Sequence, residues 1–143
     1  MSWVPPSTFV EKLKRLFFSP RQELDRIVAR ELRKGETEIH LLPQLVDPTR
    51  IAIDVGANRG VWTRQMAALC PEVHAFEPNP KIFAILDAAR PANAVTYPLA
   101  LSDRDGGSSL YVPRSARGYS NQRATLVPDQ QPGVETGVVD VET

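Results

Sequence analysis

The residues of this sequence best placed to do chemistry are a glycine-rich turn and an acid that follows it along the chain. The apolar segment 51–55 leads directly into Gly-Ala-Asn-Arg-Gly at 56–60, and Glu77 ends the next short apolar segment. In a doubly wound sheet, ligands bind outside the carboxyl ends of the strands. Gly56 lets a ligand approach the backbone because no Cβ occupies that space, and Gly60 lets the following helix sit tightly against the strand. This spacing predicts a nucleotide-type site.

The class of ligand follows from the residues around the turn. Glu77 follows Gly60 by 17 residues, where a carboxylate can hold both hydroxyls of a ribose. Asn58 stands where the fingerprint G-x-G-x-x-G has its second glycine, which speaks against a pyrophosphate and favours a nucleoside without phosphates. S-adenosylmethionine is such a ligand: Asp54 is placed for its cationic amino end, directly or through water, and the N–H groups of residues 58–60 for its carboxylate. A plain structural turn is the alternative.

The elements that must position these residues alternate along the chain. Segments 51–55, 73–77 and 94–101 are apolar and of strand type, and the stretches between them carry apolar residues at helical spacing. The order β-α-β-α-β predicts an α/β fold with a parallel sheet and right-handed crossovers. The continuous apolar run 51–55 is typical of a sheet that is covered by helices on both faces.

Residues 1–50 are expected to form a helical lead-in. Apolar residues in segment 9–17 recur on one helical face, and Ser-Pro-Arg-Gln at 19–22 is typical of a second helix start with a capping box. A third, shorter helix is expected over 39–46, with a kink at Pro43.

The lead-in is locally basic, which leaves two interpretations. The stretch from Lys12 to Lys34 could lie on an anionic membrane surface next to Phe17 and Phe18. Four acids dilute its charge, namely Glu11, Glu23, Asp25 and Glu31. We therefore expect these helices to pack on the domain or on a partner.

The last 40 residues change character. Residues 108–112 are expected to form an edge strand and residues 134–141 a further strand. The stretch 113–133 between them is rich in Pro, Gly, Ser, Arg and Gln, which predicts a mobile lid or a poorly ordered segment.

Composition excludes several classes of protein. The chain has 143 residues with 17 Lys and Arg against 17 Asp and Glu, so its charge gives no reason to expect nucleic-acid binding. No run approaches the roughly 18 apolar residues of a membrane span, and the N-terminus lacks the pattern of a signal peptide. A single cysteine, Cys70, excludes an internal disulfide and a multi-cysteine metal site and suits a reducing cytoplasm. We expect a cytoplasmic protein without metal ligands.

Three motifs, in this order and spacing, resemble signatures of the FkbM family of S-adenosylmethionine-dependent methyltransferases. They are Ala-Ile-Asp-Val-Gly-Ala-Asn-Arg-Gly-Val-Trp-Thr at 52–63, His-Ala-Phe-Glu-Pro-Asn-Pro at 74–80 and Ala-Leu-Ser-Asp at 100–103. The resemblance implies a Rossmann-like class I methyltransferase fold. It also implies O-methylation of a hydroxyl on a sugar, a lipid or a natural product, so the expected partner is a small-molecule or glycan acceptor.

The resemblance further implies which residues bind S-adenosylmethionine. Carried over by position, they are Asp54, Gly56, Ala57, Asn58, Gly60, Glu77 and Pro78. Ser102 and Asp103, expected at the tip of the third strand, would lie beside the adenine. No residue is assigned as the catalytic base.

Members of this family continue past the point that corresponds to Thr143, into a fourth core strand and further elements. Residues 51–143 are therefore expected to be the N-terminal half of the methyltransferase domain, incomplete at the C-terminus. Such a half-sheet exposes an unpaired apolar edge, which natural folds normally cover. A second copy or a partner chain is the expected cover, and the chain alone is expected to be weak or inactive.

Two other functions stay open from the sequence. One is a non-catalytic nucleoside-binding or interaction half-domain that folds with a partner. The other is a nicotinamide-dependent enzyme, which Asn58 in place of glycine already disfavours.

Overall fold

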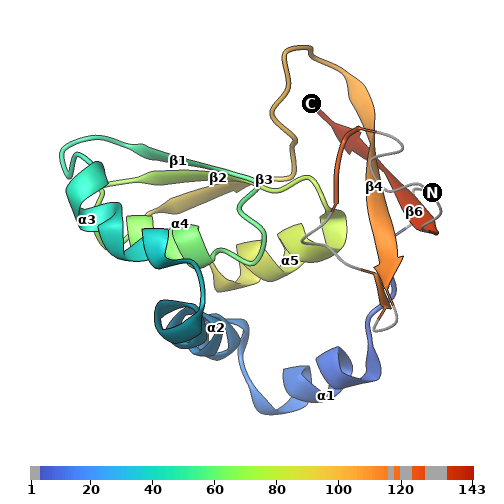
Figure 1. Ribbon diagram of the computed structural model, residues 1–143, viewed down its shortest axis with the longest axis horizontal. Coiled ribbons are helices and arrows are strands. Elements are labelled where there is room, and N and C mark those ends of the chain that lie inside the picture. Colours follow the sequence, from blue (N-terminus) through green and yellow to red (C-terminus); the bar gives the residue numbers. More distant parts are fainter. Residues whose placement is uncertain (1–3, 116–117, 120–123, 128–134) are drawn as a thin grey trace.

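The computed structural model describes residues 4–115, 118–119, 124–127 and 135–143, which form an α/β fold. Figure 1 shows a parallel sheet with helices beneath it and a second, antiparallel sheet beside it. In chain order the elements are α1 (Phe9–Phe17), α2 (Pro20–Lys34), the 3₁₀-helix η1 (Thr37–Leu41), α3 (Leu42–Leu45), β1 (Ala52–Val55), α4 (Val61–Met66), β2 (Val73–Phe76), α5 (Pro80–Ala89), β3 (Ala94–Tyr97), β4 (Gly107–Ser115), β5 (Gly118–Tyr119) and β6 (Thr136–Glu142).

The first sheet has the predicted β-α-β-α-β connection. Its three strands are parallel and lie in the order β1-β2-β3. The register aligns Ala52 with Val73 and Val73 with Ala94, so all three strands end at the same edge. The glycine turn after β1 and Glu77 after β2 are therefore brought to one edge of the sheet.

One face of this sheet carries the core. Val73 and Ala75 of β2 are completely buried. Val73 packs in a cluster with Met66 of α4, and Ala75 packs with Leu86 of α5. The apolar periodicity of both helices therefore places them on the same side of the sheet.

The opposite face is uncovered in the described part of the chain, so the expected helices on both faces are wrong there. Ile53, Val55 and Val95 are 58%, 60% and 41% exposed, and Figure 1 shows the labelled helices on the other side. The reason is topological. The connections β1–β2 and β2–β3 have the same hand, and both step in the same direction across the sheet. Their helices, α4 and α5, therefore lie on the same face.

The two long lead-in helices behave differently. Ser19 caps α2 with the predicted capping box, and Leu24 and Val28 pack against Ala89 of α5 as a further layer. In α1, by contrast, Phe9 and Phe17 are 78% and 71% exposed. Packing on the domain is therefore confirmed for α2 and wrong for the apolar face of α1. The predicted third helix is split into η1 and α3.

The C-terminal strands form a second sheet in the order β5-β4-β6. β4 and β6 are antiparallel, and their core includes Val112 and Val139, both fully buried. β4 lies between two strands, but β5 pairs only with its residues 114–115. Within 108–112, the side of β4 away from β6 is bridged in the described residues only at Tyr111, by Thr125, so the prediction of an edge strand there holds except at Tyr111. β6 corresponds to the strand expected at 134–141, although residue 134 and most of the expected lid or loop at 113–133 lie outside the described residues.

The third parallel strand is shorter than expected. β3 ends at Tyr97 rather than at Leu101, because Pro98 has no N–H to continue the ladder. The chain then pairs with β6: Leu99 forms a bridge with Glu142, and the Ala100 N–H donates to the Glu142 carbonyl at 2.9 Å. Ser102 and Asp103 consequently do not lie at the tip of β3.

No helix within the described ranges combines the length and the apolar character that crossing a bilayer requires.

The one-sided core predicts unequal effects of one substitution on the two faces of the sheet. Val73→Thr, at a fully buried position, should lower the free energy of unfolding by about 1–3 kcal/mol because its hydroxyl is buried without a partner. Val55→Thr, 60% exposed, should change it by less than about 0.5 kcal/mol. Urea denaturation measures both. Equal losses would mean that the second face is covered in solution.

Candidate functional site

The turn after β1 has an unusual backbone that its residue types permit. Gly56, Asn58 and Gly60 have φ angles of +74°, +51° and +88°, a region that glycine enters freely and asparagine tolerates. The N–H groups of Gly56 and Ala57 both donate to the Phe76 carbonyl at 2.9 Å. The end of β2 therefore fixes the turn that follows β1.

The two glycines of the turn have different surroundings. An added Cβ at Gly56 would meet no atom within 4 Å, so there is free space for a ligand at this point. A Cβ at Gly60 would lie 2.7 Å from Leu86 Cδ1. Gly60 thus permits close packing, as predicted, but the packing is against α5 rather than against a strand.

The Glu77 carboxylate is buried and hydrogen-bonded to the turn. It is 7% exposed, its Oε2 accepts the Asn58 N–H at 2.8 Å, and its Oε1 accepts the Asn79 N–H at 2.8 Å. Burial raises the pKa of Glu77 above its ordinary value, with a contribution from nearby Asp54, although the two backbone hydrogen bonds oppose the shift. Each carboxylate oxygen keeps a lone pair for one further hydrogen bond.

Asp54 connects β1 to α4. It is 8% exposed, and its Oδ2 accepts a hydrogen bond from Thr63 Oγ1 at 2.5 Å. Burial raises its pKa, while the bonds from Thr63 work against that shift. In the structure Asp54 therefore positions the helix that follows the turn.

A cavity of about 1100 Å³ lies beside the turn. Gly56, Ala57 and Asn58 line it on one side, and residues of the N-terminal segment line it on the other. The cavity is not lined by the other predicted site residues, which are Asp54, Gly60, Glu77, Pro78, Ser102 and Asp103. Ser102 and Asp103 are exposed, and Ser102 Oγ donates to Asp103 Oδ1 at 3.2 Å.

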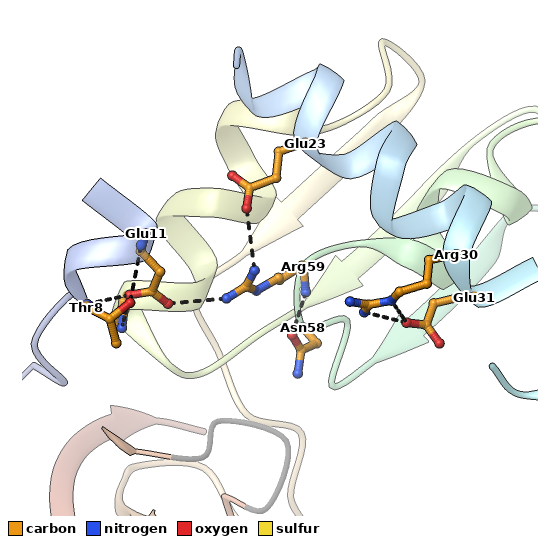
Figure 2. A network of polar contacts seen from close by, with 8 residues as sticks. Thr8, Glu11, Glu23, Arg30, Glu31, Asn58 and Arg59 are labelled. Carbon is orange, nitrogen blue, oxygen red and sulfur yellow. Dashed lines mark hydrogen bonds and ion pairs between the residues drawn. The ribbon is translucent and has the colours of Figure 1, made fainter. Parts of the chain in front are cut away.

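A charge network that the sequence analysis missed connects the lead-in to the turn (Figure 2). Arg59 lies between Glu11 of α1 and Glu23 of α2, at 3.3 and 3.7 Å. Lys81 of α5, whose side chain is 8% exposed, lies 3.0 Å from Glu11. A local signal was present: Thr8 and Glu11 exchange the reciprocal hydrogen bonds of a capping box.

This network sets the ionisation of Glu11. Partial burial favours its neutral form, but the Thr8 N–H, Lys81 and Arg59 together outweigh burial and lower the pKa of Glu11 below its ordinary value. Glu11 is therefore held as an anion at the cavity wall.

No protein-family model, curated protein or solved structure matches this chain significantly. The resemblance to the FkbM family accordingly stays a prediction based on its three motifs.

A series of glycine-to-alanine substitutions separates backbone strain from packing. Gly56→Ala should lower stability by about 1–2 kcal/mol because a positive φ is strained for alanine. Gly60→Ala should cost roughly 1–3 kcal/mol more, because its Cβ would also overpack against buried Leu86. Gly107→Ala, with open space and no positive φ, should be within about 0.5 kcal/mol of the native chain. Thermal unfolding gives the order, and equal losses at positions 56 and 60 would contradict the Leu86 contact.

The raised pKa of Asp54 predicts a pH-dependent difference between the native chain and Asp54→Asn. The folded state holds a proton on Asp54 more readily than the unfolded state, so ionised Asp54 opposes folding increasingly as the pH rises above its ordinary 3.8. Asparagine can still accept the Thr63 hydroxyl but carries no charge. The variant should therefore gain stability relative to the native chain between pH 4 and pH 7, as measured by melting temperature. A difference that shrinks with rising pH would contradict this assignment.

Proposed function

We propose that this chain is the S-adenosylmethionine-binding part of a methyltransferase with a Rossmann-like class I fold. Its reaction would be O-methylation of a hydroxyl on a sugar, a lipid or a natural product. The observation that carries the proposal is the free space at Gly56, at the carboxyl end of a parallel strand and on the wall of a large cavity. The three motifs of the resemblance support the choice of cofactor.

The turn and the cavity fit a nucleoside with an amino-acid end. Ligand pockets typically measure about 300–1,000 Å³, so a cavity of about 1100 Å³ has room for such a molecule. Gly56 would admit the ligand to the backbone. Glu77 does not itself line the cavity, so its contribution would be to hold Asn58, which does, through the hydrogen bond that it accepts from the Asn58 N–H. Ser102 and Asp103 do not line the cavity, so we assign them no contact.

The contribution of the chain would be positioning. When bound, S-adenosylmethionine supplies an electrophilic methyl group on its sulfonium. Holding two reactants in line can contribute about 7–11 kcal/mol to lowering a barrier. The left-handed turn, fixed by the Phe76 carbonyl and by Glu77, is the rigid element of this chain that would hold the cofactor. We assign no general base.

A second candidate function is an interaction module that needs a partner. It is favoured by the uncovered sheet face, on which Ile53 and Val55 of β1 are more than half exposed. Parallel sheets are normally covered on both faces. A partner that supplied the cover would complete the domain, with or without catalysis.

Calorimetry with S-adenosylhomocysteine tests the methyltransferase proposal. The folded native chain should bind it, and Gly56→Ala should weaken binding by roughly tenfold or more, because the new methyl group would occupy ligand space. Gly106→Ala is the matched control: Gly106 also has a positive φ, of +138°, and nothing within 4 Å of an added Cβ, but it lies outside the site. It should keep the native affinity.

Glu77→Gln adds a second test. Each carboxylate oxygen of Glu77 accepts one backbone N–H, and glutamine would replace one of these oxygens with an NH₂ group, which cannot accept a hydrogen bond. The variant should lose affinity by a larger factor than its loss of stability explains. A cooperatively folded native chain that gives no binding heat, or equal affinities for both alanine variants, would overturn the proposal. Preferential stabilisation by NAD would favour a nicotinamide enzyme instead.

A further inference from the structure

The apolar residues of α1 face solvent. Phe9 and Leu16 are each 78% exposed and Phe17 is 71% exposed, with Val10 and Leu13 at 58% and 44%. None of these residues belongs to the four apolar clusters of the described structure. The next residue, Phe18, is different, because the Arg26 guanidinium lies 4.0 Å from the centre of its ring. The exposed apolar stripe therefore consists of these five residues of α1 and does not include Phe18.

The polar side of α1 is the side attached to the domain. Glu11 lies 3.0 Å from Lys81 Nζ and 3.3 Å from Arg59, and Lys81 also donates to the Pro6 carbonyl at 2.9 Å. Figure 2 shows Glu11 directed from α1 toward Arg59 at the glycine turn. An ionic contact on one side of the helix thus replaces the apolar contact that normally fixes an amphipathic helix to its domain.

Helical geometry places the apolar stripe opposite this attachment. At roughly 100° per residue, the five apolar positions of α1 span an arc of about 120°, and position 11 falls near the middle of the remaining arc. Pairing Glu11 with Lys81 and Arg59 therefore directs the stripe away from the body. Figure 1 shows α1 at the margin of the molecule, away from the parallel sheet.

The charge of the helix complements an anionic surface. Its sequence, Phe-Val-Glu-Lys-Leu-Lys-Arg-Leu-Phe, has three basic residues and one acid. That acid is neutralised by cations of the body. Position 12 lies beside the apolar arc, the arrangement that lets a lysine reach lipid headgroups while apolar residues enter the acyl boundary.

We propose that α1 is an interfacial helix that docks this protein on the anionic surface of a lipid bilayer. Docking would break no described core contact, because the residues that enter the bilayer are already exposed. A bilayer accepts a convex apolar stripe without a matching groove, and an anionic one also attracts the basic residues of the helix. A second copy would instead bring the same helix, with three basic residues and one acid, against itself. The proposal is independent of methyl transfer, and its failure would leave that proposal unaffected.

Sedimentation of the full chain with vesicles tests the proposal. One set of vesicles is phosphatidylcholine alone, and the other contains equal parts of phosphatidylcholine and phosphatidylserine. We expect binding to the anionic vesicles, weaker binding to the neutral ones, and weakening of the anionic binding at about 0.5 M salt, because salt screens the headgroup charge. The double variant Leu16→Gln and Phe17→Gln should bind anionic vesicles at least roughly tenfold more weakly.

A matched control uses another exposed apolar pair. Leu41 and Leu45, 46% and 72% exposed, lie on η1 and α3, and their double change to glutamine should leave vesicle binding unchanged. Melting temperatures establish that both variants fold.

Three results would overturn the proposal. The first is no binding to anionic vesicles by the native chain, and the second is equal binding by the two double variants. The third is a concentration-dependent dimer without vesicles that only the change at positions 16 and 17 abolishes, which would make a second copy the cover of the stripe.

Discussion

The end of β2 holds three consecutive N–H groups of the turn that follows β1, and the arrangement of the site depends on these bonds. The Phe76 carbonyl accepts from Gly56 and Ala57, and the Glu77 carboxylate accepts from Asn58. Of these three residues Ala57 is buried, and its N–H left without an acceptor would cost about 1–3 kcal/mol, so these bonds hold the left-handed backbone in place. That backbone leaves the space beside Gly56 open. It also directs the chain into α4, where Asp54 and Thr63 bond to each other.

A second constraint is ionic and acts from outside the sheet. Arg59 belongs to the same turn, and its pairing with Glu11 and Glu23 attaches both lead-in helices to it. Pairs exposed to water contribute little to stability, but Lys81 beside Glu11 is largely buried. The same contacts form one wall of the cavity and turn the apolar stripe of α1 outward. The site and the orientation of α1 therefore share one set of side chains.

The elements predicted correctly from sequence are those specified by neighbouring residues. The Ser19 capping box and the glycine turn are local patterns, and the strand–helix alternation predicted the parallel sheet. Contacts between distant segments could not be predicted in this way. Apolar periodicity marks the side of α1 that avoids water, but an ionic tie from Glu11 to residues far along the chain decides where that side faces. Likewise, Ser102 and Asp103 leave the site because the chain after Pro98 pairs with β6, a strand some forty residues away.

The uncovered face of the sheet and the candidate site are linked through β1. In doubly wound sheets a ligand binds where the strand order reverses, and here β1 is an edge strand with the glycine turn at its tip. A strand paired to the free edge of β1 would make that tip the reversal point. The connection to such a strand would run in the opposite direction, so a helix in it would cover Ile53 and Val55. One addition would thus bury the exposed apolar face and add a second wall to the candidate site. If the proposed nucleoside cofactor binds there, its affinity and the coverage of the sheet should change together, because both would depend on what pairs with β1.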